Sequence, residues 1–338
     1  MRHPLNPIPV WRNVDAALFC EEILPANRPA VLKGLVETWP AVRAGLRAPR
    51  ALADYLASFA SPNPAKVLIG DPSIKGKFFY TPDMRGFNFA TEHRSIIQIL
   101  DQLMGQADDP NPVSMAAQAT DVPTFLPGFQ THNAISLVAP SISPRIWIGN
   151  AIEVAAHFDF NDNIACVVGG RRVFTLFPPD QVRNLYTGPI ELTPAGVPIS
   201  LVDFDAPDLE RHPRFAQALE AAEVAELEPG DAIYIPALWW HHVRSLDPLS
   251  VLANYWWNVA EPEVGSPFEL LLLALISLRD LPPANREAWR ALFDHWVFRD
   301  DGDPAAHMPV ESRGFLSQST PALRRHVRAM AARVLSGG

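Results

Sequence analysis

Residues 155–179 read AAHFDFNDNIACVVGGRRVFTLFPP, and this stretch decides the expected fold. It holds two β-type runs, NIACVVGG (163–170) and RRVFTLFPP (171–179), which meet at a pair of glycines. Outward from it, short apolar runs separated by turn signals continue from about residue 112 to residue 260. Such closely spaced short strands are typical of an antiparallel sandwich or barrel. The other runs are SPRIWIGN (143–150), GDAIYIPALWW (230–240), HHVRSL (241–246) and SVLANYWWNV (250–259).

Mixed and helical patterns flank this β-rich stretch. Residues 14–60 read as helix and short strand, and residues 62–90 as strands and loops. The sequence therefore predicts three regions: an N-terminal α/β flanking region (1–111), a β core (112–262) and a C-terminal helical region (263–338). The individual helices that we expect are HRSIIQILDQLMG (93–105), one within the core insertion DLERHPRFAQALEAAEV (208–224), FELLLLALISL (268–278), REAWRALFDHWVF (286–298) after Asn285 as its cap, and PALRRHVRAMAARVL (321–335) after Thr320.

The composition excludes several classes of protein. Of the 338 residues, 48% are hydrophobic and 19% are charged, so the chain can bury a sizeable core and is not disordered. Its net charge of -9 argues against a charge-driven nucleic-acid or membrane-surface binder. Cys20 and Cys166 are its two cysteines, too few for a disulfide scaffold or a cysteine-built zinc site.

The sequence shows neither a secretory signal nor a membrane-spanning segment. The first residues lack the apolar segment of a secretory signal. The longest apolar run, residues 270–276, is far too short to span a bilayer. We therefore expect a cytoplasmic protein without a membrane partner.

The segment His157-Phe158-Asp159 is the chemically informative one. Side chains two apart on a strand share a face, so His157 and Asp159 present an imidazole and a carboxylate side by side. A third metal ligand can come from the later pair His241-His242. His242 shares its face with Arg244, which is more easily placed outside a barrel, so we expect His241 to point inward; a bulge would reverse this choice.

Two histidines and one carboxylate form the facial triad of non-haem Fe(II) oxygenases, which leaves part of the metal's coordination sphere open. Imidazole and carboxylate suit Fe(II), and the lack of thiolates argues against structural zinc. The HxD pair by itself is a weak signal. It gains weight because a β-rich segment and a strand-borne histidine pair follow it at a distance that a barrel could close.

These residues lie in a longer resemblance. Residues 145–258 resemble the JmjC and cupin-like (cupin-8 type) Fe(II)/2-oxoglutarate oxygenases, and within them the branch of the asparaginyl hydroxylase that acts on hypoxia-inducible factor. The opening RPAVLKGLVETWPAV (28–42) is similar to that of the family as well. The matching pieces are IWIGN (146–150), AAHFDFNDN (155–163), GGRRVFTLFPPDQVRNLY (169–186), VDFDAPDLERHPRF (202–215), EPGDAIYIPALWWHHVRSL (228–246) and VLANYWW (251–257).

The resemblance implies a double-stranded β-helix, and it assigns roles to residues of the site. It implies that His157, Asp159 and His241 bind Fe(II). It places Asn163 and Asn254 beside the co-substrate and Trp256 in the wall near the metal. At the position where the family usually has a lysine for the distal carboxylate of 2-oxoglutarate, this chain has Arg172, whose planar fork can bind a carboxylate at two points. The chain also has Val154 where relatives often have threonine, and its strand near residue 116 lacks the family's tyrosine.

The activity that the resemblance implies is hydroxylation of a C–H bond, coupled to decarboxylation of 2-oxoglutarate by O2. The substrate would be a protein side chain or a small molecule, and the family also includes tRNA-modifying hydroxylases. Two other functions stay open: a cupin-like binding module without turnover, and a metal-dependent dioxygenase or isomerase that does not use 2-oxoglutarate. By analogy with relatives, the apolar C-terminal helices predict a homodimer.

Overall fold

In the computed structural model of the chain, eight strands of the β core pair in a nested antiparallel order, the first with the last and so on inward. This nesting is the pairing of a double-stranded β-helix, so the predicted fold is confirmed. The four pairs are β8 (Arg145–Gly149) with β15 (Ser250–Trp257), β9 (Glu153–His157) with β14 (Trp240–Ser245), β10 (Asp162–Gly169) with β13 (Ala232–Ile235), and β11 (Arg172–Phe177) with β12 (Glu223–Leu227).

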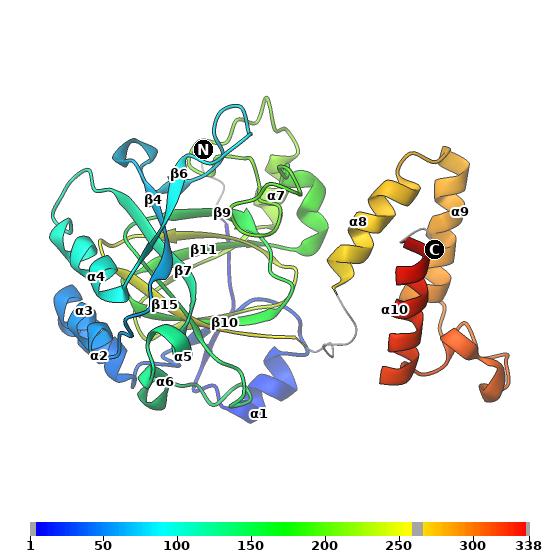
Figure 1. Ribbon diagram of the computed structural model, residues 1–338, viewed down its shortest axis with the longest axis horizontal. Helices are drawn as coiled ribbons and strands as arrows, with labels where there is room; N and C mark the ends of the chain where they lie inside the picture. The colour runs from blue at the N-terminus through cyan, green and yellow to red at the C-terminus, as the bar shows by residue number, and fades with distance from the viewer. Residues whose placement is uncertain (1–4, 259–265, 336–338) are drawn as a thin grey trace. The chain divides into compact units, whose positions relative to one another are not determined.

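The structure describes residues 5–258 and 266–335. The chain divides into two compact units, Met1–Asn258 and Val259–Gly338, and the first contains the β core (Figure 1). The described residues of the second unit, 266–335, contain helices and helical turns. They are α8 (Pro267–Leu278), α9 (Pro283–Phe293), a π-helical turn (Asp294–Phe298), two 3₁₀ turns (Val310–Ser312 and Gly314–Leu316) and α10 (Pro321–Leu335).

Strands from the N-terminal part of the chain extend both sheets of the core. The nine-stranded sheet runs in the order β2-β3-β13-β10-β15-β8-β7-β4-β6, and the six-stranded sheet in the order β1-β12-β11-β14-β9-β5. The first 111 residues thus share sheets with the core, and the division into three regions stays a prediction. The added strands are β1 (Asn6–Pro7), β2 (Val10–Arg12), β3 (Ala30–Lys33), β4 (Ala65–Gly70), β5 (Lys77–Phe78), β6 (Phe89–Arg94) and β7 (Ser114–Asp121).

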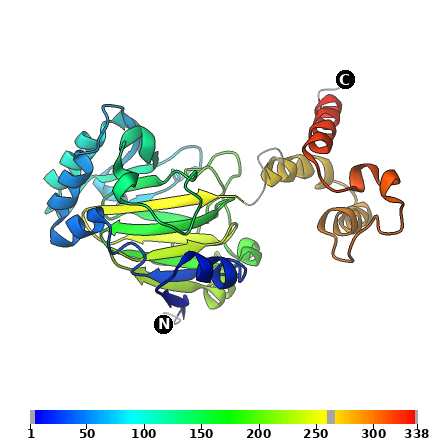
Figure 2. The same cartoon turned by 90° about the horizontal axis from the view of Figure 1, so that it is seen from below.

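The two largest apolar clusters of the first unit hold its sheets and helices together. One lies between the two sheets and includes Phe174, Ile233 and Leu252. The other lies between the nine-stranded sheet and the helices beside it, which Figures 1 and 2 show at one side of the sheets. The helices of this unit are α1 (Ala16–Leu18), which continues as a π-helical turn (Phe19–Ile23), α2 (Pro40–Arg47), α3 (Pro49–Ala57), α4 (Ile96–Gly105), α5 (Val122–Phe125), α6 (Phe129–His132), α7 (Phe215–Ala221) and the 3₁₀ helices Pro72–Ile74 and Pro179–Asn184.

Helix ends show where local sequence signals succeed and fail. Thr320 caps α10 as predicted, since its Oγ1 accepts a hydrogen bond from the Leu323 backbone at 3.2 Å. The predicted cap at Asn285 is wrong. Helix α9 begins at Pro283, because proline has the backbone angle of a first helical turn and needs no hydrogen bond there. The predicted helix at 208–224 is confirmed only as α7, because the Asp208 carboxylate accepts backbone hydrogen bonds that hold the preceding residues in a turn.

Candidate metal centre and adjoining cleft

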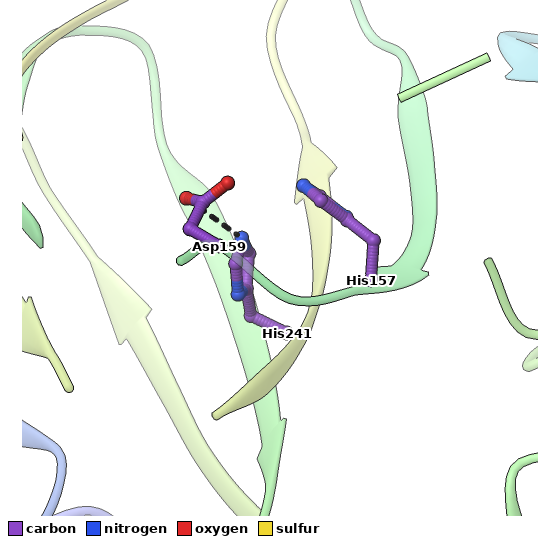
Figure 3. A group of neighbouring side chains, drawn as sticks. All are labelled: His157, Asp159 and His241. Carbon is purple, nitrogen blue, oxygen red and sulfur yellow. Dashed lines mark ion pairs between the residues drawn. The ribbon is translucent and has the colours of Figure 1, made fainter. Parts of the chain in front are cut away.

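Three predicted ligands come together at one end of the sandwich. His157 ends β9, Asp159 lies two residues further on, and His241 is in β14 (Figure 3). His157 and His241 are direct partners in the antiparallel pair of β9 with β14, so their side chains project from the same face. Chain reversal through the whole core thus produces the convergence that the sequence predicted.

The distances within this group fit a single metal ion. One possible ligand atom of each residue lies within 4.8 Å of the others. The two imidazole centroids are 4.2 Å apart, and Asp159 Oδ2 lies 3.7 Å from His241 Nε2 (Figure 3). The Leu238 backbone N–H also donates to the Asp159 carbonyl at 2.8 Å, which ties the loop of one ligand to the loop that precedes the other.

Each histidine is held by its Nδ1 atom. His157 Nδ1 lies 2.9 Å from the Ala155 carbonyl, and His241 Nδ1 lies 3.1 Å from the Trp239 carbonyl. A carbonyl only accepts, so both Nδ1 atoms carry the proton. Both Nε2 atoms are therefore left with a lone pair, which is the form of imidazole that binds metals.

Burial shapes the protonation of this group. Burial, with a contribution from His241, lowers the pKa of His157 to about 3. Burial also raises the pKa of the Asp159 carboxyl, and the neighbouring His241 and Trp256 oppose this rise. Both effects follow from the cost of a charge in an apolar setting. A divalent cation is the partner that would offset this cost for the Asp159 carboxylate.

His242 lies on the opposite face of β14 from this group. Its ring stacks on Phe204 with centroids 4.2 Å apart, and its Nε2 lies 3.1 Å from Glu153 Oε1. The extra residue of the bulge lies in β9, between Val154 and His157, and leaves the face of β14 unchanged. The bulge that would have exchanged the two histidines is thus absent from β14.

A narrow inner cavity of about 40 Å³ adjoins the three candidate ligands. The four remaining predicted residues all line it, namely Asn163, Arg172, Asn254 and Trp256. The Arg172 side chain is buried, its Nε has no hydrogen-bond partner, and among the described residues no acid pairs with it. Burial lowers the pKa of this guanidinium to about 10, so it is still charged at neutral pH. An unpaired buried cation inside a cavity fits an anionic ligand.

A chain of hydrogen bonds fixes the two amides of this cavity. Trp147 Nε1 donates to Asn254 Oδ1 at 3.0 Å, and Asn254 Nδ2 donates to Asn163 Oδ1 at 3.4 Å. Trp147 also lies edge-on to Trp256, with centroids 6.4 Å apart. Sequence reasoning missed Trp147. The signal that could have found it is the alternation along the strand IWIGN, which places Trp147 on the opposite face of the sheet from Ile146 and Ile148.

A wider cleft of about 300 Å³ leads to the ligands from outside and is lined by His157, Asp159 and Trp256. Its far wall comes from the loop at 194–199. Ser200 ties this loop to the site, because its backbone N–H donates to the Ala156 carbonyl at 2.8 Å. Val154, at the position where relatives often have threonine, contributes only apolar surface to the cleft and the inner cavity.

Comparison with known proteins identifies this architecture. Residues 16–261 match the family described as "Cupin-like domain". The chain belongs to the cupin-like domain family. This match spans the double-stranded β-helix and most of the strands that extend it, so the resemblance deduced from the sequence is confirmed.

Several known proteins are similar in sequence to this chain. The human protein named bifunctional peptidase and (3S)-lysyl hydroxylase JMJD7 is 27% identical over 273 residues, 72% of this chain and 82% of that protein. The zebrafish (Danio rerio) tRNA wybutosine-synthesizing protein 5 is 29% identical, over 74% of this chain and 75% of its own length. A lysine-specific demethylase of Arabidopsis thaliana, JMJ31, is 36% identical over 36% of this chain and 22% of its own length.

No helix within residues 5–258 and 266–335 is both long enough and apolar enough to cross a membrane. The predicted cytoplasmic location and the predicted homodimer stay predictions.

Proposed function

We propose that this cupin-like protein is an Fe(II)- and 2-oxoglutarate-dependent hydroxylase. One observation carries the proposal. Two histidines and a carboxylate converge beside a cavity that contains an unpaired, buried arginine. A metal ion and a dianion that binds it at one end match these two features together, since the triad accepts the metal and Arg172 accepts the far carboxylate.

The residues present fit such a metal. His157 and His241 offer their Nε2 atoms, since each Nδ1 is engaged with a carbonyl, and Asp159 offers a carboxylate oxygen. With three protein ligands, an Fe(II) ion bound there would keep positions for 2-oxoglutarate and O2, and it would supply the redox chemistry of C–H hydroxylation. The chain's contribution is to fix the three ligand atoms and to engage each Nδ1 with a backbone carbonyl, which leaves Nε2 for the metal.

Arg172 would orient the co-substrate. Its position at the start of β11 is fixed by cross-strand pairing with Leu227 on one side and Ser245 on the other. A guanidinium binds a carboxylate through two parallel hydrogen bonds, which sets its direction as well as its distance. Asn163 and Asn254 add fixed amides on the same side of the cavity.

Apolar walls would exclude water from the reacting groups. Phe174, Ile235, Val243 and Leu252 line the inner cavity between its few polar groups. Low polarity strengthens the pairing of Arg172 with a carboxylate and limits side reactions of the oxidant. This combination of apolar walls and few placed polar groups is typical of small-molecule sites.

The substrate is a protein side chain or a small molecule in this proposal. The name of the human relative, a lysyl hydroxylase, supports a protein substrate. The name of the zebrafish relative supports the alternative of tRNA modification. A cupin-like module that binds without turnover, and a metal enzyme that does not use 2-oxoglutarate, are the remaining alternatives.

Two measurements test the proposal. Adding 2-oxoglutarate to the Fe(II)-loaded protein without oxygen should produce a visible absorption band, and admitting air should release succinate slowly even without substrate. His157→Ala and Asp159→Ala should abolish both signals, whereas His132→Ala, a change at an exposed histidine of α6, should leave them intact. Iron binding without the band would support the enzyme that does not use 2-oxoglutarate. A band without succinate would support the binding module.

The homodimer through the C-terminal helices is a further proposal. Helix α8 exposes Leu270, Leu271 and Ile276, more apolar surface than an isolated helix usually carries. Size-exclusion chromatography with light scattering should give twice the chain mass at micromolar concentration, and a monomer mass would refute the dimer.

A further inference from the structure

Two basic side chains, Lys66 and Arg145, lie in or beside the outer cleft, on the face of the nine-stranded sheet that leads to the candidate metal ligands. Lys66 of β4 lines the cleft and is exposed. Its partner across the antiparallel pair with β6 is His93, which shares its face and is also exposed. Among the described residues no acid lies within ion-pair distance of Lys66. Its charge is therefore available to a ligand in the cleft.

Arg145 of β8 is held at the same opening. Its Nη1 donates to the Ala119 carbonyl at 3.1 Å, and its guanidinium carbon lies 5.8 Å from the centre of the Trp256 ring. Ala119 and Trp256 both line the cleft. Ala119 has a φ of +49° at the irregularity in β7, a left-handed conformation that is uncommon for alanine. The strained backbone thus points a carbonyl at Arg145 and fixes its guanidinium beside the cleft.

The acids near these two cations are already engaged. Of the described residues that line the cleft, Glu153 and Asp159 are acidic. Glu153 pairs with Arg244 at 3.0 Å and with His242 at 3.1 Å, and Asp159 belongs to the candidate metal centre. Asp121, the strand partner of Arg145, accepts hydrogen bonds from the Thr124 backbone and hydroxyl. Each of these acids therefore has a partner or role apart from Lys66 and Arg145, in a chain whose net charge is -9.

We propose that Lys66 and Arg145 select a substrate that carries a carboxylate next to the group to be oxidised. The inference rests on the proposed function, because the same cleft leads to the candidate metal centre. A carboxylate between Lys66 and Arg145 would hold the substrate at the mouth while its reacting carbon lies deeper, beside His157 and Asp159. Lys66 and Arg145 are thus specificity-determining residues, and neither belongs to the group of candidate metal ligands.

The number of cations favours a carboxylate over the backbone of a nucleic acid. Proteins that follow a phosphate backbone neutralise several phosphates with many basic residues. Here there are two cations, Lys66 in the cleft and Arg145 beside its lining residues, and the chain is acidic as a whole. Point recognition of one or two negative charges, as on an acidic peptide, matches this arrangement.

Synthetic peptide libraries test the inference. Three degenerate decapeptide libraries share a randomised centre and carry glutamate, glutamine or lysine on both sides of it. Binding to the full-length protein is measured without metal and with Mn(II) and 2-oxoglutarate, so that no turnover is needed. We expect the glutamate library to bind about three- to fivefold more tightly than the glutamine library, the range that one or two exposed ion pairs provide. Raising the salt concentration should reduce this preference.

Charge reversal provides the decisive comparison. The double variant Lys66→Glu, Arg145→Glu should reverse the preference in favour of the lysine library. Arg43→Glu makes the same kind of change at an exposed position of α2 and should leave the preference as in the wild type. Melting temperatures of all three proteins show whether the variants fold.

The inference is overturned if the wild type does not distinguish glutamate from glutamine, or if the double variant keeps the original preference. Tighter binding of a ten-nucleotide oligouridylate than of the glutamate library, at equal salt, would also overturn it in favour of RNA. Because binding is measured without turnover, a failed succinate assay would remove the proposed function and leave the charge preference standing. Normal succinate release without a preference for the glutamate library would support the proposed function and overturn the inference about Lys66 and Arg145.

Discussion

His157 and His241 face each other across β9 and β14, with ring centroids 4.2 Å apart and both Nδ1 atoms directed at backbone carbonyls. Burial, and then the neighbouring His241, lower the pKa of His157, so a proton on this ring is costly in the folded protein. The same arrangement that prepares the pair for a metal therefore makes the metal-free protein sensitive to acid.

The first prediction concerns this sensitivity. The pKa of His157 is about 3 in the folded protein and 6.5 in a free histidine, so below pH 6.5 the unfolded chain binds a proton that the folded chain does not. The free energy of unfolding therefore falls as the pH falls from 6.5 toward 3, by up to about 1.4 kcal/mol per pH unit. When the pH falls from 7 to 5.5, the free energy of unfolding of metal-free His157→Gln should fall by about 1 kcal/mol less than that of the wild type, as measured by urea titration. Equal decreases in the two proteins would contradict the low pKa of His157.

The second prediction separates stability from function at Arg172. A buried cation without a partner costs stability, so Arg172→Met should raise the free energy of unfolding of the ligand-free protein by about 1–3 kcal/mol. The same change should raise the KM for 2-oxoglutarate by about 30-fold or more, because it removes a desolvated charge pair. Urea titration and succinate release measure the two effects.

Matched variants make this test specific. Arg171→Met removes the neighbouring arginine, which is half-exposed and pairs with Asp247, and should change neither quantity much. Arg172→Lys should give an intermediate KM, because lysine restores the charge without the planar fork. A stabilised Arg172→Met with an unchanged KM would show that Arg172 does not contact the co-substrate.

The sequence predicted the convergence of His157, Asp159 and His241 better than the cleft around them, for a physical reason. Alternation along a strand places His157 and Asp159 on one face, and the position of Arg244 separates His241 from His242; both are local rules. Lys66 and Arg145 reach the cleft through cross-strand register and an irregularity in β7, which depend on strands far apart in the chain. The error at Asn285 is local too, because a proline two residues earlier competes for the same helix start.

The third prediction tests the amide chain of the inner cavity. Asn254 Oδ1 accepts from Trp147 Nε1, and its Nδ2 donates to Asn163 Oδ1. Asn254→Asp replaces the donor with an oxygen, so two acceptors face each other in a buried site. We expect a loss of stability of about 1–3 kcal/mol and a KM for 2-oxoglutarate raised several-fold. Asn111→Asp, at an exposed position before β7, is the control for the added charge.

The fourth prediction concerns a network of charges that joins the loop after the cleft wall to the six-stranded sheet. Lys77 Nζ lies 2.8 Å from Asp203 and 3.0 Å from Asp205, and Arg244 pairs with Asp205 and Glu153. The hydrogen bond from Arg244 lowers the pKa of Asp205 to about 2. For Glu153, burial alone would raise the pKa, but His242, Lys77 and Arg244 together lower it.

Carboxylates with lowered pKa values stabilise the fold above their unfolded pKa, near 4, and this stabilisation disappears as the pH falls toward 2. Glu153→Gln should therefore cost about 1–2 kcal/mol at pH 7 and make stability less dependent on pH between 4.5 and 2. Circular dichroism during acid titration measures both. Glu92→Gln, which removes an exposed partner of Arg94, should change neither, and an identical effect of the two variants would refute the role of the network.

The last prediction tests a buried carboxylate outside the candidate metal centre. Asp231 opens the hairpin before β13 and is 3% exposed. Its oxygens accept hydrogen bonds from Lys33 Nζ at 2.7 Å, the Gly34 backbone at 3.0 Å and the Glu228 backbone at 3.1 Å, so it joins this turn to β3. Asp231→Ala leaves these donors without an acceptor and should reduce the free energy of unfolding by about 3 kcal/mol, measured by urea titration. Asp54→Ala breaks an exposed pair with Arg50 and should reduce the free energy of unfolding by only about 0.3–0.5 kcal/mol. A similar reduction at both sites would show that Asp231 is no more than a turn residue.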